Sequence, residues 1–155
     1  MKGSQRVIEQ LSTLLSGELA ARDQYFAHAR LYADWGFSKL YEHTKHEMEH
    51  ETQHADELIA RLLFLEADVD LSKQDPLNVG DDVPSMLQND LDLEYRVVED
   101  LRKAMAICEE EQDYVSRDML LKMLDDTEMD HAYWLEQQLG LIKRVGLQNY
   151  LQSQI

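Results

Sequence analysis

The chain has 155 residues, and its 31 Asp and Glu residues outnumber its 15 Lys and Arg residues, giving a formal net charge of −16. This length suits one domain with a substantial core and leaves no room for a second large lobe. With 44% hydrophobic and 30% charged residues, the chain can bury enough apolar surface to fold, which excludes a disordered acidic tail. The acidic excess argues against nucleic acid as a partner and favours cations, although a plain acidic surface has the same composition.

The chain has one cysteine, Cys108, which excludes an internal disulfide, a zinc ribbon and a CxxC redox site. Cys108 falls on an apolar helical stripe, so we expect a small buried side chain rather than a reactive thiol. The first ten residues contain no apolar signal segment, and no stretch reaches the ~20 apolar residues that a membrane span needs. We therefore expect a cytoplasmic protein with no membrane partner.

Helix-forming residues fill long stretches of the chain, and no convincing strand pattern interrupts them. Apolar periodicity predicts a single domain, 1–155, with four long helices and a short C-terminal one at residues 4–34, 38–66, 83–110, 113–145 and about 147–154. The segment before the third helix contains Pro76 and Gly80 and reads as a loop able to span roughly 50 Å. The other links are short, so we predict an all-α, ferritin-like four-helix bundle with one long crossover. An up-and-down bundle with a loose loop is the alternative.

Each long helix carries a glutamate near the middle of its apolar stripe: Glu18, Glu51, Glu94 and Glu128. Burying a lone carboxylate costs several kcal/mol unless it is neutralised, paired or bound to a metal. In two of these helices a histidine follows three residues later, giving the pairs Glu51–His54 and Glu128–His131. Residues at i and i+3 share a helix face, so each pair can offer an oxygen and an imidazole nitrogen to one ion. Two lone glutamates plus two Glu-x-x-His pairs match the ligand pattern of di-iron and di-manganese bundles.

A further Glu-x-x-His match, Glu47 to His50, shows that one match alone is weak evidence. The stronger signal is the distribution of the six candidate ligands over four separate helices. Oxygen-rich ligation with two imidazoles favours iron or manganese over a thiolate-preferring metal, and iron adds redox chemistry with dioxygen. The alternative is a solvated helix face on which the spacing is coincidental.

Several long stretches of the sequence match one known family: GELAARDQYFAHARLYADWGFSKLY, EMEHETQHADELI, DYVSRDML, HAYWLEQQLGLI and the terminal GLQNYLQSQI. On these stretches the sequence resembles the bacterial ferritin and bacterioferritin family over essentially its whole length, and it looks closer to the haem-free bacterial ferritin type. The resemblance implies a hollow cytoplasmic shell of 24 subunits that oxidises ferrous iron and stores the ferric mineral inside. It also implies an iron cofactor, a di-iron centre, in each subunit.

The resemblance assigns roles to individual residues. It implies a ferroxidase site whose catalytic residues and metal ligands are Glu18, Glu51, His54, Glu94, Glu128 and His131. Glu51 and Glu128 would bridge the two irons. Glu18 and Glu94 would be terminal ligands. Tyr25 lies where the family often has a tyrosine beside the iron pair, where it would either hydrogen-bond a ligand or serve as an ordinary core tyrosine.

The position next to Glu51 departs from the pattern of haem-binding bacterioferritins, which have a methionine there. This chain has Thr52, and a threonine cannot supply a thioether to haem iron, so we expect no haem ligation of the family's kind. Met48, one turn earlier, is the only nearby substitute, and a methionine at helical spacing is more often a packing residue.

A second departure lies between Asp118 and Glu128, which are one residue further apart than in many bacterioferritins. A π-bulge would absorb the extra residue. Either Thr127 or Glu128 then aligns with the family's bridging carboxylate, and the spacing to His131 favours Glu128.

A histidine-rich stretch precedes the His54 position. In related proteins this stretch can face the inner cavity and hold an auxiliary iron, so His46, Glu47 and His50 are candidates for iron transit. A surface histidine cluster is an equally consistent interpretation.

We therefore expect an iron-storing ferroxidase that uses Fe²⁺ with dioxygen or peroxide. The expected partners are identical subunits, a haem-binding subunit in a mixed shell, and a ferredoxin for iron release. Two alternatives remain: a shell subunit of a mixed bacterioferritin assembly, and a small di-iron oxidase without storage. A rubrerythrin-like protein is excluded because it would need a Cys-rich module, and this chain has one cysteine.

Overall fold

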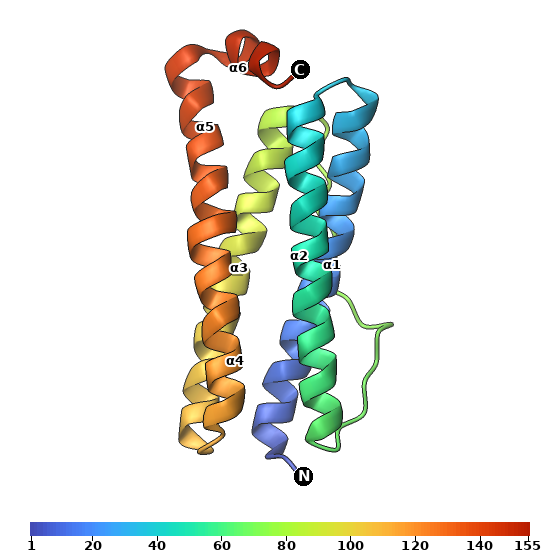
Figure 1. Ribbon diagram of the computed structural model, residues 1–155, viewed down its shortest axis with the longest axis vertical. Helices are drawn as coiled ribbons and strands as arrows, with labels where there is room; N and C mark the ends of the chain where they lie inside the picture. The colour runs from blue at the N-terminus through green and yellow to red at the C-terminus, as the bar shows by residue number, and fades with distance from the viewer.

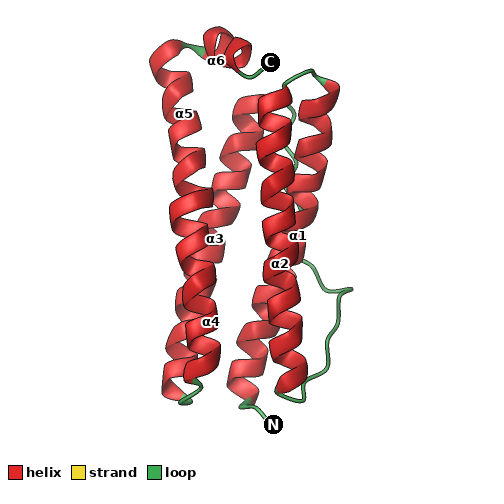
Figure 2. Ribbon diagram, viewed as in Figure 1, coloured by secondary structure: helices red, strands yellow, loops and turns green.

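The computed structural model describes residues 1–155 and contains helices and no strands. In chain order the helices are α1 (Gln5–Asp34), α2 (Ser38–Phe64), α3 (Val83–Glu110), α4 (Tyr114–Asp125), the π-helix η1 (Asp126–Ala132), α5 (Tyr133–Val145) and α6 (Leu147–Ser153). The last long helix of the bundle is α4, η1 and α5 in continuous succession, and α6 lies across one end of the bundle (Figure 1). The predicted all-α four-helix bundle with a short C-terminal helix is confirmed (Figure 2).

Local signals set the helix ends, which differ from the expected ranges by at most two residues. Helix α2 ends at Phe64 because Glu66 takes a positive φ of 62°, which an α-helix cannot continue through. The Asp82 side chain accepts from Ser85 N in a capping box that starts α3. Gly146, with φ of 85°, turns the chain from α5 into α6.

The crossover between α2 and α3 runs along the outside of the bundle and joins two parallel helices (Figure 1). Its backbone is fixed to α1: Asn78 N donates to Gln24 Oε1 at 3.0 Å, and Gly80 N donates to His28 Nε2 at 3.1 Å. Gln24 Nε2 in turn donates to Asp90 Oδ1 at 2.8 Å, and His28 Nδ1 lies 3.0 Å from Asp90 Oδ2. This buried network specifies the path of the crossover.

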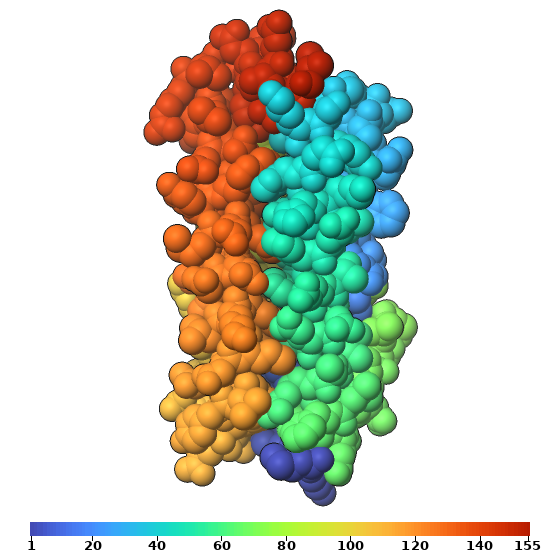
Figure 3. Space-filling view, in the orientation of Figure 1, coloured from blue at the N-terminus to red at the C-terminus, as the bar shows by residue number.

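Two apolar clusters fill the interior. A cluster of 18 buried residues, including Leu11, Leu58 and Leu101, occupies the half of the bundle that contains the N-terminus. A cluster of 9, including Leu40 and Leu87, occupies the half covered by α6. Where the clusters meet, buried acidic and histidine side chains replace apolar ones. The space-filling view shows the long helices packed closely along the bundle (Figure 3).

Cys108 is fully buried within the larger cluster, and burial raises its pKa to about 11, so the thiol stays protonated and unreactive. None of the helices has the combination of length and hydropathy that a membrane span requires.

Candidate metal centre

Three buried side chains from α1 and α2 converge at the level where the two apolar clusters meet. Glu18 and Glu51 are each 1% exposed, and His54 follows Glu51 by three residues on the same face of α2. His54 Nδ1 lies 3.7 Å from Glu18 Oε2 and 3.5 Å from Glu51 Oε2. One potential ligand atom from each side chain lies within 4.8 Å of the other two, which is close enough to hold one cation.

A second group shares Glu51 with the first. It consists of Glu51, Glu94 from α3 and His131 from η1, again with ligand atoms within 4.8 Å of one another. His131 Nδ1 lies 2.9 Å from Glu51 Oε1 and 3.4 Å from Glu94 Oε1. The two oxygens of Glu51 thus face different histidines, and this carboxylate is placed to bridge two cations.

Several buried polar atoms of these groups have no hydrogen-bond partner. They are both carboxylate oxygens of Glu18, Oε1 of Glu51, and Nδ1 of His54 and His131. His131 Nδ1, for example, approaches Glu51 Oε1 closely without the alignment of a hydrogen bond. An unpaired buried polar group costs about 1–3 kcal/mol, and bound cations would pair these atoms. The donor set, oxygen-rich with two imidazole nitrogens, fits iron or manganese.

The close packing of acids and bases determines where protons reside. Burial, reinforced by the negative charge of Glu51, raises the pKa of Glu18 well above its ordinary value. Burial opposes the ionisation of Glu51, but contacts with Glu18 and both histidines outweigh burial and lower its pKa. Burial disfavours the charged form of His54, but Glu18 and Glu51 outweigh burial and raise its pKa to about 11. A cation that binds here must therefore displace protons.

A carboxylate lies on the far side of each histidine from the centre. His54 Nε2 is 3.1 Å from Asp126 Oδ2, and His131 Nε2 is 2.6 Å from Glu47 Oε2. A carboxylate behind a metal-binding imidazole fixes the ring's orientation and increases its basicity. No motif or spacing in the sequence pointed to Asp126. Glu47 stands one turn before Glu51 on the same face of α2, and that spacing could have indicated its contact with the site.

Tyr25 donates a hydrogen bond from its hydroxyl to Glu94 Oε1. Burial and the nearby Glu94 carboxylate raise the pKa of Tyr25 well above its ordinary value, so the phenol remains a donor. In this position Tyr25 orients a carboxylate of the second group.

The structure does not bring Glu128 into the cluster, and the prediction of Glu128 as a bridging ligand is corrected. Its side chain is 39% exposed and forms an ion pair with Arg102 at 2.8 Å. The cause is η1: π-helical turns hold more residues than the ~3.6 of an α-helix, so the i, i+3 rule fails there. Thr127 faces inward instead, 1% exposed, with its hydroxyl donating to Met123 O. The extra residue was visible in the sequence, but the Glu-x-x-His spacing favoured the wrong side chain.

Neither Thr52, at the position where haem-binding bacterioferritins have a methionine, nor the nearby Met48 is placed as a ligand. Thr52 is exposed, and its hydroxyl donates to Met48 O at 2.9 Å. Met48 is partly buried against the larger apolar cluster, which is a packing role.

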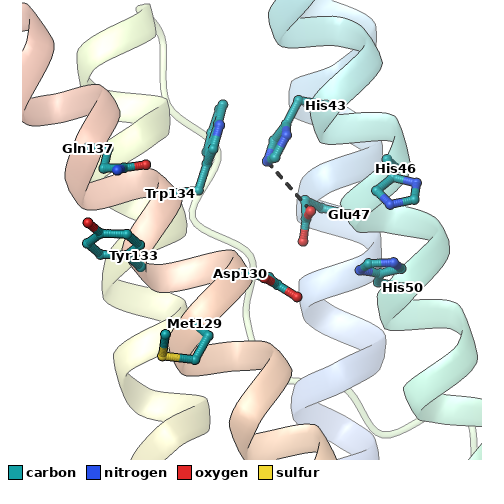
Figure 4. Close-up of a pocket in the computed structure, with 9 residues that line it drawn as sticks. All are labelled: His43, His46, Glu47, His50, Met129, Asp130, Tyr133, Trp134 and Gln137. Carbon is teal, nitrogen blue, oxygen red and sulfur yellow. Dashed lines mark ion pairs between the residues drawn. The ribbon is translucent and has the colours of Figure 1, made fainter.

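The histidine-rich stretch of α2 faces a cavity between α2 and the η1–α5 segment (Figure 4). Glu47 and His50 form a third potential metal-binding group with His131. His46 also lines the cavity but belongs to none of the three groups.

A bundle of four long helices with buried, unpaired carboxylates and imidazoles at its centre has the architecture of the helical carboxylate proteins and a side-chain set compatible with binding two metal ions. Residues 8–145 match the family described as ferritin-like domain, and the chain belongs to this family. It is 65% identical to the bacterial ferritin of Synechocystis sp. over 155 residues, which cover 100% of this chain and 99% of that protein. It is 61% identical to the bacterial ferritin of Pseudomonas aeruginosa over the full length of both. The bacterioferritin of Rhodobacter capsulatus is more distant, with 39% identity over 150 residues, 97% of this chain and 92% of that protein.

Proposed function

We propose that the protein stores iron and oxidises ferrous iron at the centre of its bundle. The observation that carries this proposal is the pair of cation-binding groups that share Glu51 in a buried, largely unpaired cluster. The chain belongs to the ferritin-like family and is similar to proteins named bacterial ferritin, and both facts support iron storage as the role that the oxidation serves.

Fe²⁺ is the substrate in this proposal. One ferrous ion binds Glu18 and His54, the other binds Glu94 and His131, and Glu51 contacts both. Each ion gives one electron, and the two electrons reduce dioxygen or peroxide. Holding two ferrous ions side by side supplies both electrons at one place. Because Glu128 turns outward and the inward-facing Thr127 has no carboxylate, Glu51 is the only carboxylate that the two groups share.

The protons held by the cluster are part of this chemistry. Glu18 and His54 have raised pKa values, so they carry protons that ferrous ions displace on binding. Reduction of dioxygen to peroxide consumes two protons, and these displaced protons are available beside the reacting ions.

We further propose that the subunits assemble into the 24-subunit shell implied by the family resemblance, in the cytoplasm. Thr52 lacks the thioether of a haem ligand, so haem in the family manner would have to come from a different subunit of a mixed shell. A ferredoxin is the proposed electron donor for iron release. A di-iron oxidase without storage is the competing function, and particle size separates the two.

The test is the addition of Fe²⁺ to the iron-free protein in air while ferric absorbance is followed. We expect fast oxidation of about two irons per chain, then continued uptake of hundreds more per shell-sized particle. Glu18→Ala should abolish the fast phase, while Glu9→Ala, which removes an exposed glutamate of the same helix, should not. Oxidation no faster than in buffer would overturn the ferroxidase. Fast oxidation by a monomer or dimer would favour the oxidase without storage.

A further inference from the structure

Two of the seven methionines are exposed at the surface of the protein. Met129 of η1 is 60% exposed, and Met1 at the N-terminus is 72% exposed. The other five are buried in the apolar clusters or packed against them: Met48, Met86, Met105, Met119 and Met123. Met1 lies at one end of the bundle, whereas Met129 stands two residues before His131 of the proposed centre. Met129 is therefore the one exposed thioether beside the centre.

Met129 lines a cavity of about 370 Å³ between α2 and the opposite helix formed by η1 and α5. Figure 4 shows Met129 on the η1 side of this cavity, across from His50 of α2. Glu47 and His50 also line the cavity, and His131 Nε2 lies 2.6 Å from Glu47 Oε2 and 3.4 Å from His50 Nδ1. Because a molecule of water takes up about 30 Å³ of the liquid, several molecules of similar size fit in this space. A small product of the centre can therefore reach Met129 without crossing the apolar core.

A thioether is the group in this cavity wall that reacts most readily with hydrogen peroxide. The sulfur gives an electron pair to one peroxide oxygen, so a sulfur–oxygen bond forms as the oxygen–oxygen bond breaks. The other oxygen leaves as water and takes both peroxide protons. Sulfur is oxidised by two electrons, and the peroxide is reduced by the same two. The aromatic rings of Tyr133 and Trp134, in the same wall, are attacked chiefly by one-electron oxidants.

We propose that Met129 is a modification site, oxidised to methionine sulfoxide by hydrogen peroxide that forms at the centre and leaves it through this cavity. The proposal rests on the proposed function, because the two-electron reduction of dioxygen by ferrous iron supplies the peroxide. Hydrogen peroxide is uncharged at neutral pH, so the carboxylates of Glu47 and Asp130 in the cavity wall do not repel it. Each Met129 consumes one peroxide molecule before that molecule reaches the solution.

The test compares peroxide made at the centre with peroxide added from outside. Iron-free protein receives repeated additions of about two Fe²⁺ per chain in air, with catalase in solution to destroy free peroxide. A reference sample receives hydrogen peroxide and no iron. Cleavage after glutamate gives peptides 1–9 and 129–136, which contain Met1 and Met129 separately, and mass spectrometry measures the sulfoxide in each. We expect the ratio of Met129 to Met1 oxidation during iron turnover to exceed the reference ratio by about tenfold or more.

Three variants test the source of the oxidant and its fate. Glu18→Ala, which should lack fast oxidation, should lower the ratio to the reference value. Met129→Leu should oxidise Fe²⁺ within about twofold of the wild-type rate and, without catalase, release about one more peroxide per chain, because it lacks the thioether. Met119→Leu, at a partly buried packing position, should release as much peroxide as wild type. A peroxidase-coupled dye measures the release, and helical circular dichroism establishes that each variant is folded.

Rapid Fe²⁺ oxidation by wild type with only the reference ratio would overturn the proposal, since Met129 would then be an ordinary exposed methionine. Oxidation of Tyr133 or Trp134 in place of Met129 would overturn it as well, because the species in the cavity would then be a one-electron oxidant. Equal peroxide release from wild type and Met129→Leu has the same meaning. Failure of the proposed function looks different: a wild type that oxidises Fe²⁺ no faster than buffer makes no peroxide at the centre and overturns both.

Discussion

At the scale of single residues, Glu51 is the side chain on which the proposed centre depends most. Its two oxygens face His54 and His131, and it belongs to both cation-binding groups of the proposed centre. Glu128, to which the family resemblance assigned an equivalent bridging role, instead pairs with Arg102 at the surface. The two glutamates are therefore a matched pair for testing which residue acts on the iron.

We expect Glu51→Gln to slow the fast oxidation of Fe²⁺ by about 100-fold or more, because it removes the only shared anionic ligand. Glu128→Gln removes an exposed ion pair worth about 0–1 kcal/mol, so its oxidation rate should stay within about twofold of wild type. Stopped-flow measurement of ferric absorbance compares the variants. Loss of the fast phase in Glu128→Gln would mean that η1 rearranges when iron binds.

The affinity for divalent cations should rise with pH. Burial disfavours the charged form of both imidazoles, but the acidic neighbours outweigh burial and raise the pKa of His54 to about 11 and that of His131 well above its ordinary value, so cations compete with protons for these nitrogens. Each displaced proton contributes about a tenfold gain in affinity per pH unit below the pKa. Co²⁺ titrations between about pH 6 and 7.5, with proton release measured directly, check this. Binding that is independent of pH and releases no protons would contradict the assignment of ligands.

At the scale of elements, the start of α4 depends on a partly buried ion pair. Asp113 accepts from Ser116 N, and Arg61 Nη2 lies 2.8 Å from Asp113 Oδ1. We expect Asp113→Ala to lower the free energy of unfolding by about 2–4 kcal/mol, since it removes the cap and leaves the partly buried Arg61 guanidinium without its anionic partner. Thermal unfolding measures the loss. Asp118→Ala, at an exposed site of the same helix, is the control and should cost less than about 0.5 kcal/mol.

The same residue gives a pH dependence of stability. Burial opposes the ionisation of Asp113, but hydrogen bonds from Ser116 and the contact with Arg61 outweigh it and hold its pKa below the ordinary value. Its stabilisation is therefore complete above the unfolded-state pKa of about 3.9 and is lost as the pH falls below it. Between about pH 5 and 3, Asp113→Ala should lose less stability than wild type. If the free energy of unfolding fell equally with pH in wild type and Asp113→Ala, this prediction would be wrong.

The crossover between α2 and α3 should become more accessible to protease when the buried Asp90 side chain is removed. Asp90 is 2% exposed and pairs with Gln24 and His28, which in turn hold the crossover backbone. Asp90→Ala leaves both partners unsatisfied, so we expect about 2–4 kcal/mol of destabilisation and faster tryptic cleavage after Lys73. Asp92→Ala, exposed on the same helix, should cleave at the wild-type rate. Equal cleavage of both variants would show that the loop is held by other contacts.

The sequence predicted the long helices well and the site less completely, for one physical reason. Helix positions follow from apolar periodicity, which assumes about 3.6 residues per turn. That assumption holds in α1, α2 and α3, where Glu18, Glu51 and Glu94 reach the centre as expected. It fails in η1, where the extra residue turns Glu128 outward and Thr127 inward. Contacts between helices, such as Asp126 with His54, leave no periodic signal at all.

At the scale of the whole molecule, the net charge of −16 acts on every approaching cation. Such a field raises the local concentration of divalent ions and their association rates by about 10–1000-fold at low salt. The centre itself is buried, so its chemistry is shielded from the bulk solution. Capture and oxidation should therefore respond differently to ionic strength.

We expect the rate of Fe²⁺ capture at low iron concentration to fall by about tenfold or more as NaCl rises from about 0.01 M to 1 M, since the Debye length shrinks from about 30 Å to 3 Å. The rate at saturating Fe²⁺ should change by less than about twofold, because the reacting groups are buried and screened little by salt. Stopped-flow measurements over a range of iron concentrations separate the two rates. If both rates fell equally, the salt would be acting on the structure of the bundle. Helical circular dichroism at each salt concentration would detect that structural change. A capture rate unaffected by salt would mean that the acidic surface has no part in guiding iron to the centre.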